Sequence, residues 1–295
     1  MKLALRSDLY YQVYGPTTFF FSIACSRLGG QKILSESIWT QPQERLRELE
    51  VGTVGSRILK WHVEDSSEVS VTYEAEIEPV FNTVEISKIP FQSIEAMDEA
   101  GIPYLFPSRY VPSDRMRTAA FDLFGSIKGP FDVAMAIEEW LFQNISYQIG
   151  TSIEQSSAAD TFIDRVGVCR DFAHLGIAFC RALNIPARYV TVYAYRLQPQ
   201  DFHAVFEVFI DRQWYLVDGT KIAPLNGMVR IASGRDAGDV AAAMLFGNVS
   251  GNGIQVSVEQ AGNSDEFVHL TRSDLMNRGE AIRMGVLDAP EFGRA

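Results

Sequence analysis

One segment of the chain has the pattern of a helix that is apolar on nearly every side. Residues 168–183 read VCRDFAHLGIAFCRAL, with no proline among them. At about 100° per residue, Arg170, His174 and Arg181 fall within one narrow polar stripe, and almost everything else is apolar. A helix with so little polar surface must be packed on most sides. The sequence therefore predicts the central helix of a domain rather than a surface helix.

The residues after this helix read as strands. Strand-like runs follow at 187–195, 202–210 and 214–218. A helix followed by antiparallel strands is typical of an α+β domain. Patterns of two further helices precede the central one, from Ser113 to about Phe124 and from Gly129-Pro130 onward.

The first part of the chain reads as β-structure. From Glu68 to Glu78, apolar and polar residues alternate, as in a strand buried on one side only. Similar runs occur at 9–14, 19–25, 32–39, 57–63 and 82–89, with turn-forming residues between them. Several short strands with one apolar face predict an antiparallel β-sandwich.

The length of 295 residues favours two domains, since about 150 residues per domain is usual. Four prolines, at positions 90, 103, 107 and 112, interrupt a stretch with weak periodicity. We therefore expect a sandwich at 1–88, a linker at 89–112 and a second domain at 113–290.

Charge and cysteine content argue against several classes of protein. Lys and Arg number 26 against 37 Asp and Glu, a net charge of −11, and no basic cluster occurs, so nucleic acid is not an expected partner. No uncharged stretch approaches the roughly 18 apolar residues of a membrane helix, and the N-terminus does not read as a signal peptide. The three cysteines are too few for a disulfide framework, which favours a reducing cytoplasm.

Cys169 is the candidate nucleophile among these cysteines. It stands at the first turn of the predicted central helix, where unpaired backbone N–H groups and the helix dipole favour a thiolate. Cys25 belongs to the apolar face of an expected strand, and Cys180 lies in the helix interior. Both are predicted to be buried, inert thiols.

A thiolate nucleophile needs a partner that protonates the leaving group, and histidine suits neutral pH. His203 opens the run 202–210. If a two-residue turn at 211–212 leads into the next strand, Val205 pairs with Asp218, which then lies on the face of His203. Asp218 could accept the imidazole N–H and hold the ring in place. A three-residue turn would break this parity.

The other histidines are weaker candidates. His62 reads as a strand-face residue of the β region, and His269 lies in a region without other functional signals. His174 is five residues from Cys169 on the central helix and points away from it, so we expect it to be solvated or to play a supporting role.

Four motifs resemble the core of the bacterial transglutaminase-like cysteine-hydrolase family. They are GVCRDFAHL at 167–175, PARYV at 186–190, HA at 203–204 and WYLVDGT at 214–220. The β region and the segment 103–114 resemble the N-terminal part of bacterial members. The resemblance implies a papain-like α+β core, with its catalytic helix packed on an antiparallel sheet and a Cys169–His203–Asp218 triad. The sequence departs from the family pattern at Val205, where an aromatic residue is familiar, and at Gly219.

The activity implied by the resemblance is acyl transfer, without a cofactor, on a peptide or protein substrate. Cys169 would attack an amide, and its backbone N–H would meet the oxyanion together with a side-chain donor, for which Tyr147 and Gln148 are candidates. Water at the acyl-enzyme gives a cysteine protease or amidase, and an amine gives transglutaminase crosslinking. We expect hydrolysis, since it is common among compact bacterial members of the family.

Three other interpretations remain open. A zinc site at Cys169, His203 and Asp218 would lack the usual fourth ligand, and no CxxC or HExxH spacing is present. A decayed enzyme core could serve as a binding module, although the candidate triad is intact. Acetyl transfer to an amine uses the same three residue types, and a test for acyl-CoA turnover would distinguish it.

Overall fold

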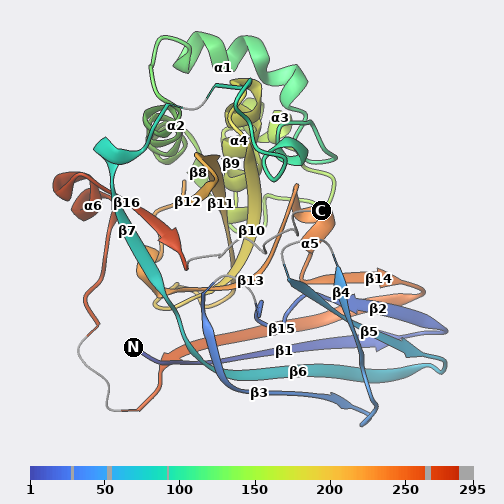
Figure 1. Cartoon of the computed structure of the whole chain (residues 1–295). Coiled ribbons are helices and arrows are strands. Elements are labelled where there is room, and N and C mark those ends of the chain that lie inside the picture. The colour runs from blue at the N-terminus through green and yellow to red at the C-terminus, as the bar shows by residue number, and fades with distance from the viewer. Residues whose placement is uncertain (28–29, 52–54, 92, 263–266, 286–295) are drawn as a thin grey trace, which may run out of the picture.

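The computed structural model describes residues 1–27, 30–51, 55–91, 93–262 and 267–285. Most of the helices gather at one end of the molecule and two sheets of long strands form the other (Figure 1). The fold is α+β, as expected. N-terminal antiparallel sheets are followed by a core whose helices pack on a third antiparallel sheet.

Two four-stranded sheets, in the orders β15-β1-β6-β3 and β14-β2-β5-β4, form the N-terminal unit. Their strands are β1 (Leu3–Val13), β2 (Thr17–Phe21), β3 (Lys32–Gln41), β4 (Arg47–Val51), β5 (Ser56–Val63), β6 (Ser67–Glu78), β14 (Ala243–Phe246) and β15 (Val249–Gln260). The alternation predicted at 68–78 is confirmed in β6, where the apolar residues are buried. The two sheets meet through aromatic rings. The ring centre of Tyr11 in β1 lies 5.1 Å from that of Phe19 and 5.8 Å from that of Phe21, both in β2.

Two strands of this unit come from late in the sequence. β15 pairs along the length of β1, and β14 pairs with β2. The second domain expected at 113–290 would contain all strands after residue 227. This holds for β13 (Met228–Gly234), but β14 and β15 lie in the N-terminal sheets instead. They cover the edges that β1 and β2 would otherwise expose.

The second unit is built on the sheet β12-β11-β10-β13. Its other strands are β10 (Ala187–Ala194), β11 (Phe202–Ile210) and β12 (Gln213–Val217). The predicted central helix is α4 (Cys169–Ala182), and its residues from Asp171 onward are all buried. A Cβ on Gly176 would lie 2.5 Å from a ring carbon of Phe206, so this glycine sets how closely α4 packs on β11.

The remaining helices are α1 (Arg117–Phe124), preceded by a 3₁₀ turn at Ser113–Met116, α2 (Pro130–Asn144), α3 (Ala158–Asp164), α5 (Ala237–Val240) and α6 (Arg272–Arg278). Two short pairs of strands complete the structure: β7 (Phe81–Glu85) with β16 (Glu280–Met284), and β8 (Ser146–Tyr147) with β9 (Val166–Gly167). Of the remaining helices, α1, α2 and α3 pack on α4, α5 packs on β13, and α6 packs on β16. Residues 286–290 of the expected second domain lie outside the described residues.

Buried and part-buried hydrogen bonds join the two units. The Tyr193 hydroxyl in β10 contacts the carbonyl of Ile23 and the hydroxyl of Ser7, each at 2.8 Å. The Gln31 side chain accepts from the backbone N–H of Arg230 and donates to its carbonyl, each at 2.8 Å. These bonds fix the second unit against the N-terminal sheets.

Candidate active site

Cys169 is the first residue of α4 and is half-buried. The helix start is fixed by Asp171, whose carboxylate accepts from the backbone N–H of Val168 at 2.9 Å and from the Ser152 hydroxyl at 3.0 Å. A Cβ on Gly167 would lie 2.7 Å from the Cβ of Asp171, so a side chain there would displace this cap. The GVCRD motif thus has a local structural reason, which is to present the thiol at the N-terminus of a buried helix.

Tyr147 lies beside this helix start, and Gln148 does not contribute its side chain there. The parallel pair β8–β9 sets Tyr147 opposite Gly167. Burial raises the pKa of the Tyr147 phenol, and the charge of the neighbouring Cys169 raises it further. The thiol of Cys169 also raises this pKa, whereas the backbone N–H of Cys169 lowers it. The Gln148 side chain instead donates to the Ser146 hydroxyl at 3.1 Å. Of the two oxyanion candidates, the structure brings Tyr147 to the thiol.

The β11–β12 hairpin brings His203 and Asp218 together. Its turn has two residues, Asp211 and Arg212, with φ of 49° and 62°. Ile210 pairs with Gln213, as the two-residue turn requires, which confirms the predicted register. The Nε2 of His203 lies 3.1 Å from Oδ2 of Asp218, which directly follows β12.

The electrostatics of this pair favour an imidazolium beside a carboxylate. Burial alone would disfavour the charged ring. The attraction of Asp218, the hydrogen bond to it and the nearby thiol of Cys169 outweigh burial and raise the pKa of His203 to about 10. Burial also opposes ionisation of Asp218, but His203 and hydrogen bonds from Thr220 keep its pKa below the ordinary value. Since Asp218 engages Nε2, Nδ1 is the nitrogen left for exchange with a thiol, and Cys169 is the thiol that acts on this ring.

Three residues that hold Asp218 were missed as site residues by the sequence reasoning. Thr220 donates to Oδ1 of Asp218 through its hydroxyl at 2.6 Å and its backbone N–H at 3.0 Å. Glu138 in α2 accepts from the backbone N–H of Asp218 at 3.0 Å and pairs with Arg272 in α6. Glu138 falls four residues after Ala134 on the buried side of α2, and a carboxylate on such a stripe was a usable signal.

His174 is buried rather than solvated. Its ring stacks on Tyr110 at 5.1 Å and tilts against Tyr189 at 5.0 Å, while Nε2 accepts from the backbone N–H of Ala237 at 3.1 Å. Burial, then the charges of Arg170 and Arg181, hold the pKa of His174 well below its ordinary value. A neutral ring packed among aromatic residues supports the interior of the core. Of the two expected alternatives, the solvated position was wrong and the supporting role remains.

The other two cysteines are as expected. Cys25 and Cys180 are both buried and unpaired. Burial raises the pKa of the Cys25 thiol to about 12 and that of the Cys180 thiol further. Neither thiol is available as a nucleophile at neutral pH.

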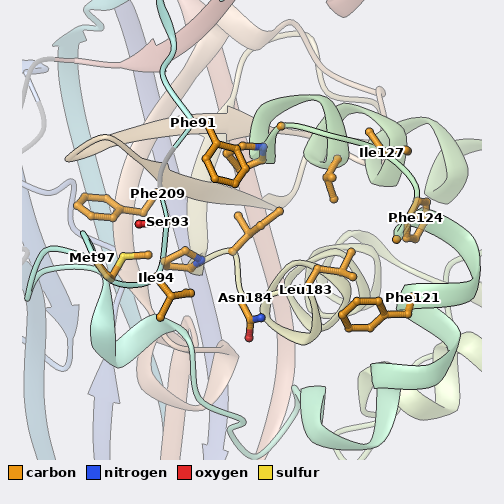
Figure 2. A pocket seen from close by; sticks show the side chains of 16 residues that line it. Phe91, Ser93, Ile94, Met97, Phe121, Phe124, Ile127, Leu183, Asn184 and Phe209 are labelled. Carbon is orange, nitrogen blue, oxygen red and sulfur yellow. The ribbon is translucent and has the colours of Figure 1, made fainter.

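An apolar cavity of about 370 Å³ opens at the opposite end of α4 from Cys169 (Figure 2). Leu183 and Asn184, which follow the helix, line it together with Phe121, Phe124 and Phe209. None of its lining residues belongs to the Cys169, His203 and Asp218 constellation. The cavity is therefore separate from the candidate active site.

The described part of the chain contains neither a group of side chains suited to a metal ion nor a helix suited to a membrane. Within it, no group of three or more His, Cys, Asp and Glu side chains is arranged to hold a metal ion. Within the same residues, every helix is too short or too polar to cross a membrane.

Comparisons with known proteins agree with this architecture. Residues 117–219 match the Transglutaminase-like superfamily, and residues 1–99 match the Bacterial transglutaminase, N-terminal domain. The chain belongs to this superfamily, in its bacterial form with the N-terminal domain. The resemblance seen in the motifs is thereby confirmed.

Two relatives span most of the chain. A solved structure from Cytophaga hutchinsonii, described as a candidate cysteine protease, is 38% identical, covers 96% of this chain and 97% of its own, and has a TM-score of 0.91. An uncharacterised protein of Mycobacterium leprae is 26% identical over 220 residues, which are 70% of this chain and 74% of that protein. Both units of the fold are thus shared with the Cytophaga protein.

Proposed function

We propose that the protein is a thiol-dependent hydrolase of peptide or glutamine-type amide bonds, with Cys169 as nucleophile, His203 as acid and base, and Asp218 as the group that orients His203. The observation that carries the proposal is the buried His203–Asp218 contact beside a cysteine at a helix start. The likeness to a candidate cysteine protease supports the same class of reaction.

In the first step, the sulfur of Cys169 forms a bond to the amide carbon, and the carbonyl electrons move to oxygen. The backbone N–H of Cys169 and the Tyr147 hydroxyl would donate to this oxyanion. When the tetrahedral intermediate collapses, the C–N bond breaks and His203 gives its proton to the departing amine. His203 then takes a proton from water as the water oxygen bonds to the thioester carbon. The C–S bond breaks, which releases the acid and restores the Cys169 thiolate beside the His203 imidazolium.

Asp218 acts without taking a proton. Its carboxylate accepts the Nε2–H of His203, which leaves Nδ1 directed to the exchange with sulfur and substrate. Thr220 keeps the second carboxylate oxygen occupied.

We also propose that the protein works in the cytoplasm. Its three cysteines form no disulfide, which suits a reducing compartment.

Transglutaminase crosslinking is the second candidate, and Asp201 favours it. Burial raises the pKa of this carboxyl group, although the Phe202 N–H and His203 oppose the rise. The charge of Asp201 also raises the pKa of Tyr147, which we propose as the oxyanion donor. A carboxylate there would attract a cationic acceptor amine.

The test compares the wild type with Cys169→Ala on a panel of peptide amides and glutamine peptides, each with and without a primary amine. We expect product from the wild type only, as free acid in both conditions. Amide-linked product that replaces the acid when amine is present would assign crosslinking instead. Equal behaviour of the two proteins on every substrate would refute acyl transfer through Cys169.

A further inference from the structure

The backbone at Asp218 is held by a buried ion pair from outside the hairpin. Glu138 is 2% exposed and Arg272 is 8% exposed, and their side chains meet through two bonds, from Nε at 2.7 Å and from Nη2 at 3.0 Å. Glu138 accepts from the backbone N–H of Asp218 at 3.0 Å. The Nη2 of Arg272 also donates to the carbonyl of Leu216 at 2.7 Å. The pair therefore binds both polar backbone groups that flank Val217.

The place of these contacts in the sheet explains why they are needed. β12 is an edge strand of the sheet β12-β11-β10-β13, and it ends at Val217. In a strand, the carbonyl of one residue and the N–H of the residue two further on point to the same side. At Leu216 and Asp218 these groups have partners in Glu138 and Arg272 rather than in a neighbouring strand. Without the pair, a buried N–H and a buried carbonyl would be left unsatisfied.

We propose that the Glu138–Arg272 ion pair is a positioning device for Asp218. The segment that contains α6, which follows β15 in the sequence, thereby helps to complete the active site. Arg272 lies in α6, beyond β14 and β15, and beyond residue 219, where the superfamily match ends. This inference rests on the proposed function, because it concerns how Asp218 keeps His203 in its working orientation.

Charge balance is part of the device. Glu138 brings a carboxylate to the backbone of another carboxylate residue, and two like charges near one another disfavour ionisation of Asp218. The guanidinium of Arg272 neutralises Glu138, so the acceptor that holds Asp218 adds no net charge. Loss of Arg272 would leave an unpaired buried carboxylate and free the strand end.

The pH profile of Cys169 alkylation by iodoacetamide reports on this device without a known substrate. Cys25 and Cys180 are buried and have raised pKa values, and the Cys169→Ala variant gives their background. Displacement of Asp218 removes the charge that keeps His203 protonated, so less thiolate forms at neutral pH. In Arg272→Met we expect the midpoint of alkylation to move up by about one pH unit, which is roughly tenfold less thiolate below the midpoint. Arg272→Lys, which keeps the charge but not the fork of donors, should lie between the two.

Arg57→Met is the matched control. Arg57 is also buried and paired with carboxylates, Glu36 and Glu48, but it lies in the N-terminal sheets. The Arg57→Met variant should have a lower melting temperature than the wild type but the same midpoint of Cys169 alkylation. If Arg272→Met does not fold, Glu138→Gln decides. It keeps an oxygen for the Asp218 N–H, which favours folding, but its amide nitrogen cannot accept from Arg272, so the ion pair is lost and the midpoint should still move up.

The outcomes separate the two proposals. A wild-type midpoint in folded Arg272→Met or, if that variant does not fold, in Glu138→Gln would overturn the positioning role. An equal shift in Arg57→Met would do the same, since it would trace the effect to general loss of stability. If wild-type Cys169 itself reacts like an ordinary thiol and His203→Ala changes nothing, the proposed function fails instead.

Discussion

The Nε2 of His203 lies 3.1 Å from the Oδ2 of Asp218, and both side chains are buried. A carboxylate in that position can only accept, so the ring donates from Nε2 and keeps Nδ1 for other chemistry. The contact joins a residue that opens β11 to a residue that follows β12. It is the relationship on which the proposed reaction depends.

Asp218→Asn should flatten the pH dependence of stability. Asp218 holds the pKa of His203 raised, from 6.5 to about 10, so the imidazolium stabilises the fold below pH 6.5 and this contribution is lost as the pH rises toward 10. The free energy of unfolding of the wild type should fall across that window, and the variant should lose most of the slope. Urea unfolding at several pH values measures it. Asp65→Asn, the same change at an exposed carboxylate, should keep the wild-type slope.

Tyr147→Phe should lower kcat by about a hundredfold or more, since one oxyanion donor is commonly worth that much. The ring can keep its contact with Phe172, at 5.9 Å, so folding should be preserved. Gln148→Ala serves as the control, because the Gln148 amide donates to Ser146. Steady-state kinetics on an amide found in the substrate panel gives both values. A large loss in Gln148→Ala with none in Tyr147→Phe would reverse the assignment.

Thr220→Val should loosen Asp218. The hydroxyl donates to Oδ1 at 2.6 Å, and a hydrogen bond to a charged group is worth roughly 1.5–3 kcal/mol. If that difference reaches the transition state, kcat/KM falls by about tenfold or more. Thr220→Ser keeps the hydroxyl and should retain most of the activity. Equal kinetics for the valine and serine variants would mean that the backbone N–H of Thr220 suffices.

Gly176→Ala should destabilise the core by about 1–3 kcal/mol, the usual cost of overpacking. The added Cβ would lie 2.5 Å and 2.7 Å from two ring atoms of Phe206, between α4 and β11. Gly15→Ala has no heavy atom within 4 Å of the new Cβ and should be near neutral. Urea midpoints compare the two. An unchanged midpoint in Gly176→Ala would show that Phe206 can move aside at no cost.

Local patterns in the sequence predicted much of the fold and part of the site. The apolar run 168–183 predicted α4 because its period matches a helix, and the alternation at 68–78 predicted β6 because its period matches a strand. The separation of His203 and Asp218 along the sequence predicted their contact, provided that a two-residue turn joins the two strands. That turn formed although Asp211 and Arg212 are not glycine or asparagine, and both adopt positive φ.

Other features had no local signature. The sequence of β15 shows a strand, but its period does not say that it pairs with β1 rather than with the second unit. His174 lies on a polar stripe, which left a solvated position and a supporting role both open, and Tyr110 and Tyr189 cover its ring. A periodicity tells which residues share a face, and only the packing tells what covers that face.

By itself, the sequence determined the central helix, the cysteine at its start, and the parity that sets His203 and Asp218 on one side of a hairpin. These features depend on residues that are close together in the sequence, because the regular geometry of a helix or a hairpin sets which of their side chains share a face. The tertiary structure alone decided that Tyr147 reaches the thiol, and that Glu138 and Arg272, 134 positions apart, meet behind Asp218. Such contacts form because buried polar groups must find partners, and the partner is chosen by the packing of distant segments rather than by any local pattern.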